Sequence, residues 1–136
     1  MTALDTSFLI YSCDRADPIR QRRAIDLIES TEDGVMLWQV ACEFIAASRK
    51  LQQQGFTLQD AWDRLTEFLD LFPLMLPDPG VLQMARDLNA GGRWSFWDST
   101  IVAACMTGGV GVLYSEDLPG RQPPEGLRIV NPFSND

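Results

Sequence analysis

The sequence predicts a single α/β domain built on a mostly parallel sheet of about five short strands. Two observations predict this fold class. Short apolar runs alternate along the chain with longer segments of helical periodicity, and these runs lie at residues 2–5, 35–37, 74–76, 110–114 and 127–130. Short apolar strands separated by helices are typical of parallel sheets, in which ligands bind beyond the carboxyl ends of the strands.

The predicted helices carry start signals of their own. Asp17 and Asp78 each precede a proline that suits the first turn of a helix, and Thr57 with Asp60 fits the pattern of a capping box. One helix is predicted to begin directly after Asp5. The other helices are predicted to cover residues 18–30, 38–54, 57–72, 79–90 and 95–106.

Length and composition limit the organisation of the chain. With 136 residues, 46% of them hydrophobic, it is long enough for one sizeable core and too short for two. We therefore expect one domain over residues 1–136. The first residues show no basic segment followed by an apolar run, and no stretch approaches the roughly 20 apolar residues of a membrane span. We expect a cytoplasmic protein without a membrane partner.

The residue types exclude several kinds of catalysis. The sequence contains no histidine, which removes Ser-His-Asp hydrolysis, His-ligated zinc and a base for a catalytic cysteine. Cys13, Cys42 and Cys105 lie far apart and outside any metal-binding spacing, so we expect reduced, buried thiols. Any chemistry at this chain must use carboxylates.

Four acids interrupt or end apolar segments. Asp5 and Asp117 follow predicted strands, Asp98 lies in the first turn of a helix that begins after Ser95, and Glu43 is the only charge between residues 35 and 48. Each acid has a structural explanation of its own, as a helix cap, a turn residue or a solvent-facing side chain. Together, at one edge of a parallel sheet, they predict a metal site.

The donor set indicates the kind of metal. Oxygen ligands without histidine or thiolate select a hard cation, so Mg²⁺ or Mn²⁺ is expected. Such an ion supports hydrolysis of a phosphodiester by an activated water. Glu116 should point away from its neighbour Asp117 and is left out of the predicted site.

The net charge of −8 argues against a broad basic surface that holds nucleic acid. The cations are nevertheless grouped locally: Arg20, Arg22 and Arg23 form one group, and Arg49 and Lys50 form another. Two interpretations stay open for each group, a solvated helix face or a contact with the substrate.

These residues together resemble the PIN-domain ribonucleases, and more closely the VapC-like toxins of prokaryotic toxin–antitoxin pairs. The resemblance covers almost the whole chain and rests on the order and spacing of five motifs: Leu4-Asp5-Thr6-Ser7, Glu43 within its helix, Ser95-x-x-Asp98 followed by Ile101-Val102-Ala103-Ala104, Ser115-Glu116-Asp117-Leu118, and Val130-Asn131-Pro132-Phe133.

The resemblance implies a three-layer α/β/α sandwich and a Mg²⁺- or Mn²⁺-dependent endoribonuclease, a hydrolase of the EC 3.1 class. It carries the catalytic site onto Asp5, Glu43, Asp98 and Asp117. Asp5 and Asp98 would be the principal metal ligands, and Glu43 and Asp117 would complete the site or act through water. The resemblance also implies that the hydroxyls of Thr6 and Ser115 support this site. It further implies a homodimer and a cognate antitoxin whose tail covers the site.

One alternative function stays open. A PIN fold with little activity of its own could bind RNA or a protein partner instead. The apolar stripe between residues 58 and 72, with Trp38, Trp62 and Trp94, fits either core packing or such a partner surface.

Overall fold

The computed structural model describes residues 1–118 and 122–134. Its centre is the predicted parallel sheet of five strands, and their order is β3-β2-β1-β4-β5. The strands are β1 (Thr2–Leu4), β2 (Gly34–Leu37), β3 (Leu74–Met75), β4 (Val112–Tyr114) and β5 (Arg128–Val130). Because β1 is the middle strand, the residue that follows it lies at the centre of the carboxyl edge.

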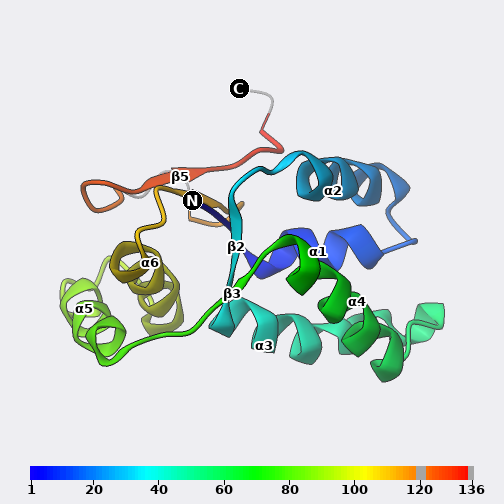
Figure 1. The fold of residues 1–136 in the computed structure, drawn as a ribbon, viewed down its shortest axis with the longest axis horizontal. Helices are drawn as coiled ribbons and strands as arrows, with labels where there is room; N and C mark the ends of the chain where they lie inside the picture. The colour runs from blue at the N-terminus through cyan, green and yellow to red at the C-terminus, as the bar shows by residue number, and fades with distance from the viewer. Residues whose placement is uncertain (119–121, 135–136) are drawn as a thin grey trace.

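Helices cover both faces of this sheet and complete the expected three layers. Figure 1 shows α5 and α6 on one side and α1 to α4 on the other. The helices are α1 (Thr6–Cys13), α2 (Pro18–Ser30), α3 (Trp38–Ala47), α4 (Leu58–Leu71), α5 (Pro79–Ala90) and α6 (Phe96–Gly108). Within residues 1–118 and 122–134, no helix is both long and apolar enough to cross a membrane.

The prediction of one continuous helix over residues 38–54 is wrong. Helix α3 ends at Ala47, and a 3-10 helix, η1 (Ser48–Gln54), follows it. The hydroxyl of Ser48 donates a hydrogen bond of 2.7 Å to the Ile45 carbonyl, a side-chain bond that competes with regular helix geometry. The tighter helix buries Leu51 and ends at Gly55, whose φ of 84° suits glycine.

The core joins helices from both layers to the sheet. Its fully buried side chains include Phe8 of α1, Phe44 of α3, Val102 of α6 and Leu113 of β4. All three cysteines are free of disulfides among the described residues, but the expectation that all three are buried is wrong. Cys42 is exposed because it lies on the outer face of α3, whereas Cys13 and Cys105 are buried.

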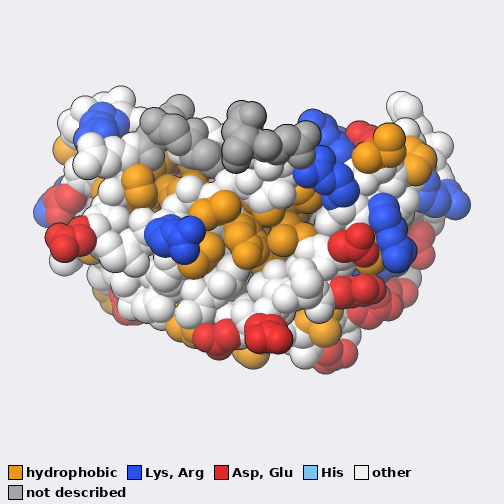
Figure 2. Space-filling view, turned by 90° about the horizontal axis from the view of Figure 1, so that it is seen from above, with side chains coloured by type: hydrophobic (Ala, Val, Ile, Leu, Met, Phe, Trp, Pro, Cys, Tyr) orange, Lys and Arg blue, Asp and Glu red, His pale blue; other side chains and the backbone are white. Residues whose placement is uncertain are grey.

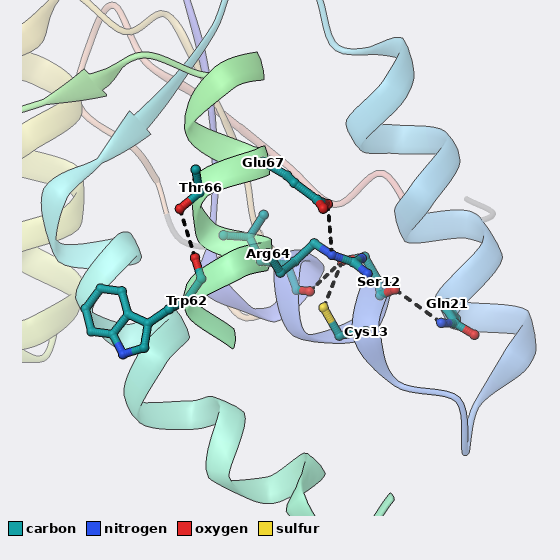
Figure 3. A network of polar contacts seen from close by, with 8 residues as sticks. Ser12, Cys13, Gln21, Trp62, Arg64, Thr66 and Glu67 are labelled. Atoms are coloured by element: carbon teal, nitrogen blue, oxygen red, sulfur yellow. Dashed lines mark hydrogen bonds and ion pairs between the residues drawn. The ribbon is translucent and has the colours of Figure 1, made fainter. Parts of the chain in front are cut away.

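Helix α1 is joined to α2 by a polar contact as well as by packing, and an ion pair lies within α4. In Figure 3, Gln21 of α2 donates a hydrogen bond of 3.2 Å to the Ser12 carbonyl, and Arg64 pairs with Glu67 on α4 at 3.2 Å. Burial raises the pKa of the Cys13 thiol in this setting. The last turn of α1, the helix that Asp5 caps, is therefore tied to α2.

The amphipathic helix α4 begins with the predicted capping box. The Asp60 N–H donates to the Thr57 hydroxyl at 3.1 Å, and the Thr57 N–H donates to the Asp60 carboxylate at 2.9 Å. The stripe between residues 58 and 72 packs into the core in part, and the partner-surface interpretation stays a prediction. Leu58, Trp62 and Leu71 are about half exposed. The buried side chains of the stripe are Ala61, Leu65, Phe68 and Phe72.

The substitution Thr57→Ala should lower the free energy of unfolding by about 1 kcal/mol, because it removes one half of this box. Urea unfolding followed by circular dichroism measures the effect. Thr66→Ala is the matched control, since its hydroxyl bonds back to the Trp62 carbonyl within the same helix at 3.0 Å (Figure 3) and adds little or no stability. Equal losses in the two variants would contradict the proposed role of the cap.

Candidate active site

Asp5 lies directly after the central strand and caps α1. One carboxylate oxygen, Oδ1, accepts a hydrogen bond of 2.7 Å from the Thr6 N–H, and Oδ2 accepts one of 3.1 Å from the Ser115 hydroxyl. The Asp5 N–H donates to the Tyr114 carbonyl at 2.9 Å and continues the pairing of β1 with β4. Two neighbouring strand ends therefore fix the orientation of this carboxylate.

Glu43 reaches the same edge from α3. Its Oε2 accepts a hydrogen bond of 2.7 Å from the Thr6 hydroxyl, and its Oε1 accepts one of 2.9 Å from the Gln39 side-chain amide. Thr6 thus contacts both acids, Asp5 through its backbone and Glu43 through its side chain. The two predicted hydroxyls, Thr6 and Ser115, are both buried and both directed at carboxylates.

Gln39 belongs to this arrangement although the sequence analysis did not select it. Its side-chain oxygen accepts a hydrogen bond from the Thr100 hydroxyl, and its amide also reaches the Trp97 carbonyl at 3.4 Å. Gln39 therefore links α3, which carries Glu43, to the first turns of α6, which carries Asp98. The sequence signal for Gln39 was its position four residues before Glu43, because residues with this spacing share one helix face.

The electrostatic setting of Asp5 favours a cation. Desolvation raises the pKa of its carboxyl, and the negative charges of Glu43 and Asp117 raise it further, against the lowering effect of the hydrogen bonds from Thr6 and Ser115. Beneath the site, burial and the charge of Asp5 raise the pKa of the Cys105 thiol to about 12. This thiol stays protonated at neutral pH and forms part of an apolar floor.

The other two predicted acids lie at the beginning of α6 and just beyond β4. Asp98 is half-buried in the first turn of α6, where its N–H donates to the Ser95 hydroxyl at 3.1 Å. Asp117 is exposed just beyond β4. Among residues 1–118 and 122–134, no three acidic or cysteine side chains lie close enough together to form a ready-made metal site.

Glu116 is engaged elsewhere. Its carboxylate accepts a hydrogen bond of 2.6 Å from the Tyr11 hydroxyl. Burial, this hydrogen bond and the charge of Glu116 raise the pKa of Tyr11 to about 12. The structure thus directs Glu116 toward α1, whereas the charge of Asp117 acts on Asp5.

The residues present fit a hard divalent cation. The available donors are carboxylate and hydroxyl oxygens, which suit Mg²⁺ and Mn²⁺ rather than softer metals. A half-buried carboxylate beside two like charges is stabilised by a positive charge. The donor chemistry of these residues therefore suits such an ion.

Comparison with known proteins agrees with this description. The chain belongs to the PIN domain family, whose family model matches residues 2–118. The fold is similar to the crystal structure of Mycobacterium tuberculosis VapC20, described as a toxin that cleaves the sarcin–ricin loop. The two share 18% sequence identity with a TM-score of 0.67, over 88% of this chain and 92% of VapC20. A comparison with curated protein sequences gave no significant match.

The raised pKa of Asp5 predicts how stability depends on pH without metal. A carboxyl whose pKa is higher in the folded state favours folding when protonated, and this contribution is lost as the pH rises through the folded-state pKa. In EDTA, Asp5→Asn should therefore melt at a higher temperature than the wild type at pH 7. Asparagine keeps the capping oxygen.

Melting curves of both proteins between about pH 4 and pH 7 measure the effect. The advantage of Asp5→Asn should shrink toward the acidic end. A constant difference across this range would show that the Asp5 carboxyl does not titrate with a raised pKa.

Replacing Gln39 with methionine should disturb Glu43, because it removes one of the two donors that hold the carboxylate. We expect a loss of about 1 kcal/mol in stability and about tenfold or more in affinity for Mn²⁺, as when a partner of a metal ligand is lost. Denaturant unfolding and calorimetric titration measure these changes. Gln53→Met, at an exposed position of η1, is the control; equal behaviour of both variants would refute the role of Gln39.

Proposed function

We propose that this chain is a metal-dependent endoribonuclease that hydrolyses phosphodiester bonds of RNA. The observation that carries the proposal is the Asp5 carboxylate: it is half-buried at the end of the central strand of a PIN fold, with Glu43 and Asp117 close enough to raise its pKa. A site of this kind uses carboxylates alone, which suits a chain without histidine.

The proposed ion is Mg²⁺ or Mn²⁺, with Asp5 and Asp98 as its principal ligands and Glu43 and Asp117 completing the site. When bound, such an ion lowers the pKa of water and stabilises charge that develops on the phosphodiester. The protein positions the carboxylates: Ser115 orients Asp5, while Thr6 and Gln39 hold Glu43.

We further propose that the protein acts as the toxin of a toxin–antitoxin pair and forms a homodimer. The similarity of its fold to VapC20, a toxin by description, supports this proposal. An apolar groove of about 500 Å³ also supports a protein partner. Large side chains around it are exposed by 44 to 67%; they are Trp38, Leu76, Leu82, Phe96 and Trp97.

The substitution Asp98→Asn tests the proposed activity. It keeps the size and first-turn position of the side chain and removes a proposed metal ligand. We expect RNA cleavage in Mg²⁺ or Mn²⁺ to fall at least about 100-fold, on the scale of losing a catalytic group. Cleavage of total RNA by purified protein, freed of any antitoxin, is the measurement. Asp70→Asn, an exposed acid on α4, is the control and should retain activity.

The outcomes separate the proposed enzyme from its alternative. Equal cleavage or equal growth arrest by wild type and Asp98→Asn would refute the nuclease proposal. A folded wild type that binds RNA or a protein without cleaving RNA in either metal would favour the binding module instead.

A further inference from the structure

A second cluster of side chains lies beside the acidic residues and joins α1, α2 and the end of the chain. The rings of Tyr11 and Phe133 stack with centroids 6.0 Å apart and planes inclined by 27°. The Arg20 guanidinium lies 5.0 Å from the Tyr11 ring centre, and that of Arg23 lies 4.6 Å from the Phe133 ring centre. We call Tyr11, Arg20, Arg23 and Phe133 the arginine–aromatic platform.

The platform fixes the positions of both guanidinium groups by hydrogen bonds. Arg20 donates a hydrogen bond of 3.4 Å to the Tyr11 hydroxyl, and Arg23 donates one of 2.9 Å to the Phe133 carbonyl. Within the described parts of the chain, neither forms an ion pair with a carboxylate, whereas Arg22 on the same helix pairs with Asp26 at 3.4 Å. In the view of Figure 2, Lys and Arg side chains gather at the right, over α2.

This platform is continuous with the proposed active site. The Tyr11 hydroxyl, which accepts from Arg20, donates to Glu116 at 2.6 Å, and Glu116 is the neighbour of Asp117 in the chain. Tyr11 also lies on the helix that Asp5 caps, six residues further on, or about 9 Å along the helix axis. One short length of an extended strand can therefore contact both groups.

We propose that the arginine–aromatic platform binds backbone phosphates of the RNA strand that enters the acidic site. This inference rests on the proposed ribonuclease function and extends it by assigning the substrate-contacting cations. A guanidinium group has five N–H donors in a planar fork that matches phosphate oxygens, and each platform arginine uses one of its donors within the protein. Because each arginine is already stacked on a ring, its side chain would lose less conformational entropy on binding.

The platform also explains how a chain of net charge −8 could hold RNA. A few fixed cations beside the site suffice for local phosphate contacts, and the remaining acidic surface repels the rest of the strand. Carboxylates of a protein partner would also fit the guanidinium groups of Arg20 and Arg23. The position of the platform next to the proposed cleavage site favours RNA, and the experiment below separates the two ligands.

The test measures binding of a short fluorescein-labelled single-stranded RNA to the full chain carrying Asp98→Asn, so that the RNA stays intact. Fluorescence anisotropy is recorded from about 50 to 200 mM KCl. Arg20→Gln and Arg23→Gln, each added to Asp98→Asn, should lower the slope of log affinity against log salt by about 0.7, as expected for one lost phosphate contact on a single strand.

Two further variants make the comparison specific. Arg22→Gln removes the same charge from the same helix and should leave the slope unchanged. Arg20→Lys keeps the charge but not the planar fork, so it should keep the slope while weakening binding severalfold. Melting curves of all variants identify any that fail to fold, and at such a position the lysine substitution is judged by a severalfold loss of affinity at an unchanged slope.

The inference is overturned if Arg20→Gln and Arg23→Gln match Arg22→Gln, or if the Asp98→Asn protein shows no salt-dependent binding of RNA. Both results leave the proposed function standing as long as the wild type cleaves RNA in a metal-dependent manner. Loss of that cleavage activity would instead refute the proposed function itself.

Discussion

The structure depends on one electrostatic constraint, the placement of the Asp5 carboxylate at the end of the central strand. Its burial and its acidic neighbours disfavour the ionised form, and such a group is stable only when donors or a cation surround it. The protein supplies two donors directly, the Thr6 N–H and the Ser115 hydroxyl. Protonation of the carboxyl or a bound cation can offset the remaining negative charge.

The strand order places other polar side chains beside the Asp5 carboxylate. Leu4 pairs with Tyr114 across β1 and β4, so Asp5 and Ser115 follow at the same level of the sheet. Thr6 then connects Asp5 to Glu43 on α3, and Gln39 connects that helix to α6. Acids that are distant in sequence are thereby held by neighbouring strand ends and by two cross-linked helices, which limits how far they can move apart.

Much of this arrangement could be predicted from the sequence, because its signals are local. Short apolar runs predicted the strands, and Thr57 with Asp60 predicted a capping box that the structure confirms. The end of α3 at Ala47 was missed because the Ser48 hydroxyl bonds to the backbone, an interaction that hydrophobic periodicity does not show. The exposure of Cys42 was missed because it depends on which face of α3 meets the core.

For the candidate site, the position of Asp5 after a strand followed from the order of the elements. The link from Gln39 to α6 and the arginine–aromatic platform could not be predicted in this way, since both depend on contacts between distant segments, such as the hydrogen bond from Arg23 to Phe133. The sequence could group Arg20, Arg22 and Arg23, but only the structure separates the stacked pair from the arginine that pairs with Asp26.

The most direct test of the account is the binding of Mn²⁺ to the purified protein, followed by electron paramagnetic resonance as free Mn²⁺ is depleted. The account predicts saturable binding to the wild type, and binding to Asp5→Asn that is at least about tenfold weaker. A wild type that takes up no Mn²⁺, or equal uptake by Asp5→Asn, would contradict the claim that the acids at this strand end form a metal site.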